Sequence, residues 1–367
     1  MKQQILFTAA ALFSTTTLLA QLPVSQSAEN RNVVLEEFTG IHCVYCPDGH
    51  KRAQELKDAN PNDVILINIH VGGYAVPSSG EPDFRTPYGP SIANQSGLTG
   101  YPAGTINRHE FEGGKTALSR SKWNQYGNVV LGEASYANVA LQSSIDIASR
   151  LLTVDVEVYY TGDGPASNKL NIAILQDGIE GPQTGMSYNP AQVLPNGKYQ
   201  HNHMLRHLLT GQWGDAINTT TQGTLIQRQY TYTIPADLKG VEYVLKDLAV
   251  VAFLAEGNQE IVTGASGPLY VGTTSVEDEN NMIVGVNAYP NPTSGNVSFE
   301  INLAEKSTVN VQVLNNLGQV VVNNTTSELS AGASTLDLSL EGLNNGIYYA
   351  HIHVAGSTVV KRISVLK

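Results

Sequence analysis

The sequence has very few cysteines: its 367 residues contain two, Cys43 and Cys46, and no second pair. A structural zinc site takes four ligands, usually two cysteine pairs or cysteines combined with spaced histidines. The nearby histidines, His42, His50 and His70, follow no regular spacing, so half of a metal site is the least favoured interpretation. A structural staple is also weak, because a disulfide between residues three apart closes a very short loop and gains little loop entropy. A reactive redox pair is the third interpretation, and all three stay open here.

Charge is also scarce, at 14% of the residues, and 21 basic against 32 acidic residues give a formal net charge of -11. Nucleic-acid binding depends on clustered Lys and Arg. The sequence has no such cluster and no basic amphipathic stretch of the kind found in membrane-surface helices. It also has no Gly-x-Ser-x-Gly and no Walker loop, and its carboxylates are scattered. Nucleic-acid binding, serine hydrolysis, phosphoryl transfer and glycosyl transfer are therefore disfavoured, and we expect no bound cofactor and no resident metal.

Long apolar runs are missing except at the start, where Lys2 precedes ILFTAAALFSTTTLLA and a polar stretch follows. This arrangement predicts a secretory signal peptide over residues 1–20, because the run is too short to span a bilayer. No cysteine follows it directly, so we expect no lipid anchor, and we expect no transmembrane segment in the mature protein. The mature protein should therefore be exported to an oxidising compartment, where a close cysteine pair tends to exist as a disulfide.

Beyond the signal peptide the sequence pattern changes twice. Residues 30–132 alternate strand and helix patterns: NVVLEEF and DVILINIHV predict buried strands, CPDGHKRAQELKDAN a helix between them, and TALSRSKWNQYGNVVLGE a closing helix. Residues 133–272 contain strand-length runs separated by turn residues, which predicts a β-sandwich. Residues 273–282 are a polar linker, and residues 283–367 predict a smaller all-β unit. The expected fold is multidomain: an α/β domain followed by two β-sandwiches.

The cysteine pair opens the predicted helix. A helix N-terminus offers free N–H groups and the positive end of the helix dipole, and both stabilise a thiolate. We expect Cys43 at that end and Cys46 one turn further in, the arrangement in which the first thiol is acidic and the second can resolve it. Pro47 falls in the first turn, where a missing N–H costs little.

The order strand, Cys-x-x-Cys, helix, strand and a later Gly-Tyr-Pro before another strand resembles the thioredoxin fold, over residues 30–132. In that family an acidic side chain six positions before the first cysteine lies buried beneath the pair, and the loop facing the disulfide ends in a cis-proline. The resemblance implies a Cys43–Cys46 disulfide in the oxidised state, with Cys43 as the attacking thiolate and Cys46 as the resolving thiol. It implies Glu37 as the buried proton acceptor, and Pro102 with Tyr101 as a platform for the substrate backbone.

The sequence departs from thioredoxin itself in two places. The dipeptide between the cysteines is Val44-Tyr45 rather than Gly-Pro, a change that should alter the reduction potential in a direction the sequence does not give. The insertion from Gly72 to Gly100 is longer than a minimal thioredoxin carries, and we expect it either to cover the disulfide or to bind a partner.

A second resemblance covers about residues 30–270. The segment LEEFTGIHCVYCPDGHKRAQEL, with QHNHMLRHLLTGQWGD in the following β-domain, is similar to the outer membrane protein 28-related family of Gram-negative bacteria. This family implies a thioredoxin-like domain joined to a β-sandwich in an exported protein. Its members have been regarded as surface proteins or adhesins, so the resemblance implies no particular reaction.

His201, His203 and His207 lie close together in YQHNHMLRHLL. On a strand, His201 and His203 would point the same way and could share a metal. We favour hydrogen bonding at a domain interface or in a loop, because the motif contains no Asp or Glu to complete a metal site. His351 and His353 also share one face of a predicted strand, and we expect them on its solvent side.

The last segment, residues 283–367, resembles the C-terminal sorting domain of type IX secretion substrates. It carries a Pro-Asn-Pro turn at Pro290–Pro292, then the LNNLGQ turn and the GIYY strand start, in the order typical of that family. An ordinary small immunoglobulin-like sandwich would show the same strand pattern. The resemblance implies that the type IX secretion machinery reads this domain as an address and that it is removed near SVEDENNMIVG. The body of the protein would then be released or attached at the outer-membrane surface.

Two functions stay open. The first is thiol–disulfide exchange with protein thiols or disulfides, which the combination of Glu37, the Cys43–Cys46 pair and Gly-Tyr-Pro favours. The second is a non-enzymatic surface binding protein or adhesin that uses the thioredoxin fold as a scaffold and keeps its disulfide locked. A destination outside the cell, far from known reductants, favours this second function.

Overall fold

The computed structural model describes residues 22, 24–267, 269–272, 283–315, 319–354 and 357–367. The predicted signal peptide, residues 1–20, and the predicted linker, residues 273–282, lie outside the described residues. The chain divides into two compact units between Thr273 and Thr274. Each unit has hydrophobic cores of its own.

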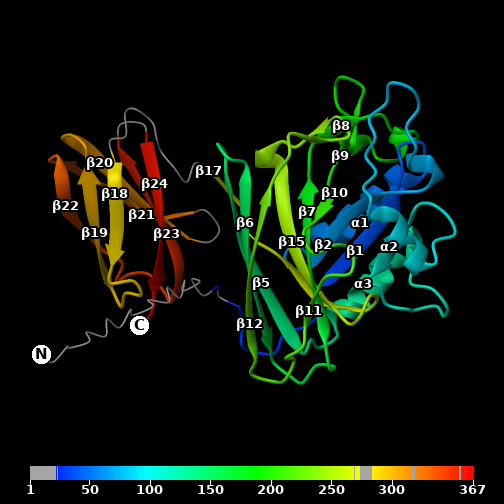
Figure 1. Ribbon diagram of the computed structural model, residues 1–367, viewed down its shortest axis with the longest axis horizontal. Helices are drawn as coiled ribbons and strands as arrows, with labels where there is room; N and C mark the ends of the chain where they lie inside the picture. The colour runs from blue at the N-terminus through cyan, green and yellow to red at the C-terminus, as the bar shows by residue number, and fades with distance from the viewer. Residues whose placement is uncertain (1–21, 23, 268, 273–282, 316–318, 355–356) are drawn as a thin grey trace, which may run out of the picture. The chain divides into compact units, whose positions relative to one another are not determined.

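One large mixed sheet forms the centre of the first unit (Figure 1). Its strand order is β16-β15-β7-β10-β2-β1-β3-β4, and β11 pairs with β7 off this path. β1 and β2 run parallel, and β3 is antiparallel to β1. The strands are β1 (Val33–Thr39), β2 (Val64–His70), β3 (Ala103–Ile106), β4 (Leu118–Ser119), β7 (Asn168–Gln176), β10 (Met204–Leu208), β11 (Asp215–Ile217), β15 (Leu248–Ala255) and β16 (Ile261–Ser266).

Both faces of β1 and β2 are covered, which is why these strands are continuous apolar runs. One face packs against α1 (Cys46–Ala59) and α3 (Trp123–Leu131) in a core that includes Leu35, Leu56 and Trp123. The other face contributes Phe38 and Ile67 to a second core, which also contains residues of α2 (Gly89–Ser96).

The helices follow the predictions to different degrees. α1 begins at Cys46 and ends before Asn60-Pro61, as the segment CPDGHKRAQELKDAN predicts, but Cys43, which we expected at the helix end, lies in the turn before it. α3 occupies the second half of the predicted closing helix. α2 was not predicted, because it lies in the insertion of residues 72–100, whose glycines, prolines and serines read as loop. Gly97, with a φ of +70°, ends α2.

A second sheet, β12-β6-β5-β17, packs against the large sheet at β7 and β15. Alternate residues of β7 and β15 point to opposite faces, so Ile172 and Val250 belong to the core shared with β5 and β6, whereas Ala173 and Val251 belong to the core shared with β1 and β2. One sheet therefore serves both the α/β part and the sandwich. The strands of the second sheet are β5 (Ala137–Asp146), β6 (Leu151–Tyr160), β12 (Leu225–Thr233) and β17 (Leu269–Gly272).

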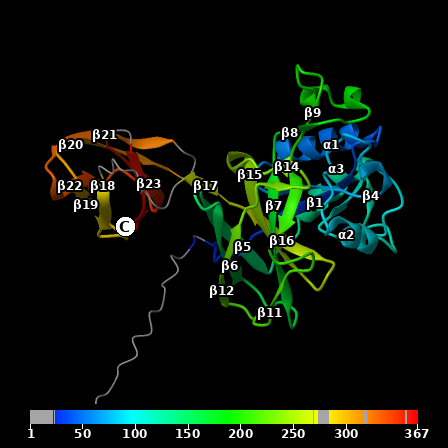
Figure 2. The same cartoon turned by 45° about the horizontal axis from the view of Figure 1, so that its top comes forward.

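Two short strand pairs complete the first unit. β13 (Asp237–Leu238) pairs with β14 (Val241–Glu242), and β8 (Ile179–Gly181) pairs with β9 (Tyr199–His201). Figures 1 and 2 both show β8 and β9 next to α1. This position matters for the site, because α1 begins with one of the two cysteines.

The second unit is a small β-sandwich of two sheets. Three strands form β18-β19-β22 and four form β21-β20-β23-β24, and a single core takes residues such as Phe299 and Ile352 from the two sheets. The strands are β18 (Ile283–Tyr289), β19 (Asn296–Leu303), β20 (Ser307–Leu314), β21 (Val320–Leu329), β22 (Gly332–Ser339), β23 (Gly346–Val354) and β24 (Ser357–Val365). In the part of the chain that the structure describes, no helix has the length and apolar character needed to cross a membrane.

Candidate functional site around the Cys43–Cys46 disulfide

Cys43 and Cys46 form a disulfide at the start of α1, with a Cα–Cα distance of 5.4 Å. Both residues are buried, Cys43 with 3% of its surface exposed and Cys46 with none. Val44 and Tyr45, the two residues between them, are 45% and 50% exposed. The disulfide is therefore enclosed, while the dipeptide that links the cysteines faces solvent.

Glu37 lies in the middle of β1, fully buried, and neither of its carboxyl oxygens has a hydrogen-bond partner among the described residues. A Cβ atom on Gly49 would lie 2.4 Å from Glu37 Oε1 and 3.0 Å from Cβ of Pro102, so both side chains meet α1 at this glycine. Gly49 follows Cys46 by three residues and lies on the same face of the helix. Burial raises the pKa of Glu37 well above its ordinary value, and the charge of Arg120 lowers it in part. The fold thus brings Glu37, Pro102 and the face of α1 that carries Cys46 together.

Tyr101, which precedes Pro102 through a cis peptide bond, turns toward the insertion. A Cβ atom on Gly72 would lie 2.1 Å from Tyr101 Oη, so a glycine is needed at residue 72. The ring of Tyr101 packs edge to face on Tyr74, with 5.6 Å between the ring centroids. Tyr74 in turn adjoins the cysteine loop, because its carbonyl oxygen accepts a hydrogen bond from the His42 N–H at 2.9 Å.

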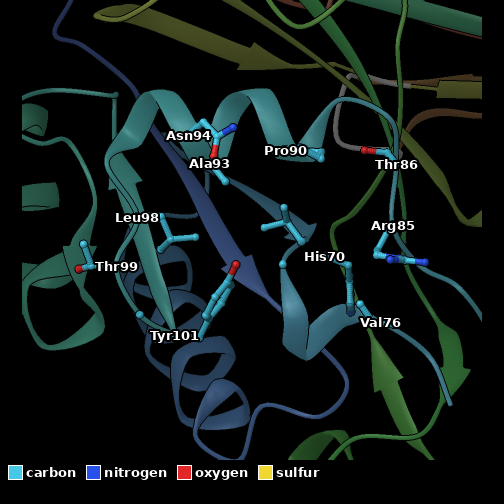
Figure 3. Close-up of a pocket in the computed structure, with 13 residues that line it drawn as sticks. His70, Val76, Arg85, Thr86, Pro90, Ala93, Asn94, Leu98, Thr99 and Tyr101 are labelled. Atoms are coloured by element: carbon cyan, nitrogen blue, oxygen red, sulfur yellow. The ribbon is translucent and has the colours of Figure 1, made fainter.

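The insertion also forms a cavity of about 510 Å³, with Tyr101 in its wall. Figure 3 shows Tyr101 and Leu98 on one side of this cavity and Arg85 and Thr86 on the other. His70 and Thr86 are 3% and 5% exposed, and neither the His70 ring nitrogens nor Thr86 Oγ1 have a partner in the described part of the chain. A cavity of this size with apolar walls and a few free polar groups suits a small molecule or a peptide side chain.

A segment of the sandwich part, residues 182–188, covers the cysteine loop, and we call it the cover segment. Its Thr184 N–H donates to the carbonyl oxygen of Ile41 at 2.8 Å. The side-chain amide of Gln183 donates to the carbonyl oxygen of Cys43 at 3.0 Å. These bonds fix the backbone on both sides of the first cysteine.

The cover segment also touches the residues between the cysteines. Tyr188 packs against Tyr45, with 5.3 Å between the ring centroids. Gly185 has a φ of +75° and passes so close to Val44 that a Cβ atom there would lie 1.9 Å from the carbonyl oxygen of Val44. The cover segment therefore packs directly on the dipeptide between the two cysteines.

Three buried histidines lie next to the site, packed with aromatic rings. His70 and His201 are 5.3 Å apart between ring centroids, and Phe84 lies 4.9 Å from His201. Burial lowers the pKa of His50 to about 3 and that of His201 to about 4, and it holds the pKa of His70 well below its ordinary value. These three imidazoles are therefore neutral at neutral pH.

His50 connects this cluster to Glu37. Its Nε2 lies 3.8 Å from Glu37 Oε1 and 2.9 Å from Thr39 Oγ1. Its Nδ1 lies 2.9 Å from Tyr199 Oη. His50 follows Cys46 by four residues, a spacing that also places the two on one helix face.

His201, His203 and His207, which we considered as metal ligands and favoured as hydrogen-bonding groups, do not come together. His201 ends β9, and His203 has a φ of +53°, so the two share no strand face. His203 Nε2 contacts Gln54 Oε1 at 3.3 Å, and His207 Nδ1 lies 3.0 Å from Tyr88 Oη. Within residues 22–272 and 283–367, as far as these are described, no three His, Cys, Asp or Glu side chains form a group suited to a metal ion.

Sequence reasoning missed the contributions of Tyr199 and Gln183. Tyr199 lies 149 positions from His50, and Gln183 lies 140 positions from Cys43. No local pattern predicts such contacts. The only available signal was the four-residue spacing of Cys46 and His50, which places the histidine beneath the disulfide.

Comparison with known proteins assigns both parts of the chain. Residues 91–265 match the family Outer membrane protein Omp28, and residues 287–366 match the Secretion system C-terminal sorting domain. The chain is an Omp28-related protein with a secretion sorting domain. The resemblances to the outer membrane protein 28-related family and to the type IX sorting domain are thereby confirmed, although the Omp28 match begins after the cysteine segment. The Omp28-related protein is exported and is located at the outer-membrane surface or outside the cell, and its sorting domain implies recognition by the type IX secretion machinery.

Solved structures add information on the fold. HBP35 of Porphyromonas gingivalis is similar with a TM-score of 0.52 and 21% identity, over 92% of this chain and 99% of that one. A protein from Agrobacterium tumefaciens matches with a TM-score of 0.41 and 13% identity, over 69% of this chain and 99% of that one. At these identities the likeness to HBP35 concerns the mostly β, multi-sheet fold alone, and the second match is too low to support an argument. No curated protein matches the chain.

Proposed function

We propose that this Omp28-related protein exchanges disulfides with other exported proteins through Cys43 and Cys46, on a thioredoxin-like arrangement formed by β1, α1, β2 and β3. The observation that carries the proposal is the position of Glu37. A carboxyl group without a partner, fully buried against the helix face that carries Cys46, has no evident structural benefit. It is well placed to accept or donate the proton of that cysteine.

In the reduced protein the Cys43 thiolate attacks one sulfur of a substrate disulfide and forms a mixed disulfide, and the other substrate sulfur leaves as a thiolate. The Cys46 thiol then gives its proton to the Glu37 carboxylate, and its sulfur attacks Cys43 Sγ. This step forms the Cys43–Cys46 bond and releases the second substrate sulfur as a thiolate. Pro102 and Tyr101 border this region and would hold the substrate backbone.

The reverse cycle oxidises a substrate dithiol and needs no other reagent. A substrate thiolate attacks Cys43 Sγ, Cys46 leaves as a thiolate, and protonated Glu37 returns a proton to it. The second substrate thiolate then attacks the substrate sulfur of the mixed disulfide and releases Cys43. The raised pKa of Glu37 supports this direction, because burial favours the protonated carboxyl group that donates in this step.

The first experiment is to equilibrate the purified mature protein with glutathione and to measure the reduction potential by thiol alkylation. We expect a value in the range of roughly -120 to -270 mV found for working oxidoreductases.

Cys43→Ser should abolish exchange with a disulfide-bonded test protein, and Cys46→Ser should accumulate a mixed disulfide through Cys43. Failure to trap any thiol partner with Cys46→Ser would count against the proposal.

A second function, a surface binding protein with a locked disulfide, has its own observation in favour. Cys43 is only 3% exposed beneath the cover segment, and the cavity of about 510 Å³ beside Tyr101 offers a place for a ligand. A potential below about -300 mV with resistance to reduction would mark a structural disulfide and favour this function. Binding would then be tested with short apolar peptides, by comparing the wild-type protein with Leu98→Asp, which places a charge in the cavity wall.

A further inference from the structure

Glu37 poses a problem for the exchange just proposed, because it has no contact with solvent. Its side chain is fully buried, and its two carboxyl oxygens have no hydrogen-bond partner among the described residues. Each reductive cycle leaves the Cys46 proton on this carboxyl group. The proton must leave before the carboxyl group can act as a base again, so a catalytic Glu37 requires an exit route through neighbouring groups.

We infer that His50 and Tyr199 form this route and relay protons between Glu37 and solvent beside Gln192. His50 Nε2 lies 3.8 Å from Glu37 Oε1, and His50 Nδ1 lies 2.9 Å from Tyr199 Oη. Tyr199 donates its hydroxyl hydrogen to the side-chain oxygen of Gln192, which is partly exposed. The chain of groups therefore leads from the buried acid to the surface. The inference rests on the proposed exchange function and adds two positioning residues to it.

The hydrogen-bond directions favour this route. Because the Tyr199 hydroxyl donates to Gln192, its oxygen is left to accept, and the His50 Nδ1–H is the group that points at it. The His50 Nε2 then carries a lone pair, which at rest accepts a hydrogen bond from the Thr39 hydroxyl at 2.9 Å. When that hydroxyl turns away, the lone pair is free to accept the proton of Glu37. A shift of about 1 Å would bring Glu37 Oε1 within hydrogen-bond distance of Nε2.

The transfer balances in protons. Glu37 gives its hydrogen to His50 Nε2, His50 releases the hydrogen on Nδ1 to Tyr199 Oη, and Tyr199 releases its own hydroxyl hydrogen to the side-chain oxygen of Gln192, whose partly exposed amide passes it to solvent. His50 is left with its hydrogen on Nε2, and reorientation of the ring and of the Tyr199 hydroxyl restores the first tautomer. The carboxylate of Glu37 is restored, and neither relay residue gains or loses charge. A relay of this kind needs groups that are neutral at rest. Burial provides this condition, since it lowers the pKa of His50 to about 3 and raises the pKa of Tyr199.

The charges around the relay also matter for its pH response. Arg120 is the cation that acts on Glu37. His201 and His203 are the neighbours whose charge would further lower the pKa of His50. His201 is itself buried and neutral near pH 7, because burial lowers its pKa to about 4. Arg120, and Glu37 once it has lost its proton, are therefore charged groups near the relay, and the charge of Asp177 acts on the neighbouring His203.

Half of the route comes from outside the α/β part of the fold. His50 lies on α1, whereas Tyr199 is the first residue of β9 in the sandwich part. Asn189, also from that part, donates to Tyr199 Oη at 3.2 Å and holds it in place. An α/β part without β8, β9 and their connection would lack the outer half of the relay.

The experiment uses Tyr199→Phe, which removes one hydroxyl group and keeps the ring, and His50→Gln. Tyr160→Phe is the matched control, because Tyr160 is equally buried and its hydroxyl donates to Asn168 far from this site. Each protein is supplied with an excess of a disulfide-bonded fluorescent substrate and with a small dithiol reductant, and repeated turnover is timed, because the relay acts only when Glu37 must lose its proton before the next cycle. We expect both relay variants to slow turnover at least about 10-fold at pH 7, within the range of proton-transfer catalysis, with the reduction potential unchanged. Imidazole in the buffer should partly restore the rate of His50→Ala.

A second measurement does not depend on exchange activity. Infrared spectroscopy of the oxidised protein after transfer to D₂O follows the replacement of hydrogen by deuterium on the protonated carboxyl group of Glu37, and Glu37→Gln identifies the band. We expect this replacement to be at least about 10-fold slower in Tyr199→Phe than in the wild type and in Tyr160→Phe. Equal replacement rates would overturn the relay even if the protein exchanges disulfides. If the wild type exchanges no disulfides but the replacement rate still falls, the exchange function fails while the proton route stands.

Discussion

At the scale of single residues, the two adjacent acids of β1, Glu36 and Glu37, have different surroundings and different roles. Neighbouring residues of a strand point to opposite faces, and both acids are buried. Glu36 forms two hydrogen bonds with the guanidinium of Arg108, at 2.6 and 2.7 Å, and Arg108 lies over the ring of Phe253. Glu37 faces α1 without a partner. Glu36 is therefore part of a structural ion pair, and only Glu37 is available for proton transfer.

The sequence indicated the buried acid but not its surroundings. The position of Glu37, six residues before Cys43, sufficed to predict its burial from the thioredoxin resemblance. The pairing of Glu36 with Arg108 was not predictable, because it depends on Arg108 adopting a φ of +49° at the end of β3. Such a conformation is uncommon for an arginine and has no local sequence signal.

The buried histidines predict a loss of stability in mild acid. His50 and His201 have pKa values lowered by burial to about 3 and about 4. Unfolded histidines bind a proton near pH 6.5, so below that pH the unfolded state takes up more protons than the folded state. The free energy of unfolding should therefore fall as the pH drops from about 6.5 toward 4, by roughly 1.4 kcal/mol per pH unit for each such histidine.

Tryptophan fluorescence during urea unfolding at several pH values checks this prediction. The chain has two tryptophans, Trp123 and Trp213, both before residue 273, so the signal reports the first unit alone. His201→Phe should lower the change in unfolding free energy per pH unit by roughly 1.4 kcal/mol, the contribution of one histidine. His353→Gln, in the second unit, should leave this change as it is in the wild type. A wild-type slope of zero between pH 6.5 and 4.5 would contradict the assignment of neutral buried histidines.

At the scale of elements, the parts that the sequence predicted are those that local patterns determine. The limits of β1, α1 and β2 agree with the predicted strand, helix and strand to within a few residues. α2 escaped notice because a helix of 8 residues between Pro-rich and Gly-rich stretches has little periodic signal. The pairing of β2 with β10, which joins the α/β part to the sandwich strands, rests on the contact of Asn68 with Met204. Pairings over such sequence distances depend on tertiary packing rather than on local sequence.

The cover segment, residues 182–188, predicts that access to the disulfide can be changed without touching the cysteines. Gly185→Ala would place a methyl group 1.9 Å from the carbonyl oxygen of Val44, so the segment must move away from the cysteine loop. We expect the disulfide to be reduced by a small phosphine reductant about 10-fold faster in this variant than in the wild type, because opening of the cover limits access.

The matched control is Gly197→Ala. Gly197 also has a positive φ, +78°, but its added methyl group would meet no atom within 4 Å. It therefore reproduces the backbone strain without the clash at Val44. If both variants are reduced at the same rate, strain alone explains the effect, and the cover segment does not control access.

At the scale of the whole molecule, the disulfide and the tryptophans all belong to the first unit, and the second unit has a separate core. The two units should therefore unfold in separate transitions. Reduction should affect the first transition only. A disulfide that closes a loop of this length contributes about 2 kcal/mol through loop entropy, which corresponds to a fall in Tm of roughly 4–8 °C for a unit of this size.

Calorimetry with and without reductant, alongside tryptophan fluorescence, tests this expectation. Cys43→Ala/Cys46→Ala is the control variant, which no reductant should affect.

The size of the stability difference between the oxidised and reduced protein also separates the two proposed functions. The extra stability of the oxidised fold lowers the reduction potential below that of an unfolded dithiol by about 30 mV for each 1.4 kcal/mol. A shift near 2 kcal/mol leaves the pair exchangeable, because the fold then favours the oxidised state only slightly. A shift of about 6 kcal/mol or more would mean that the cover segment and the buried cluster hold the bond closed, and the protein would then act through its surface and cavity rather than through its cysteines.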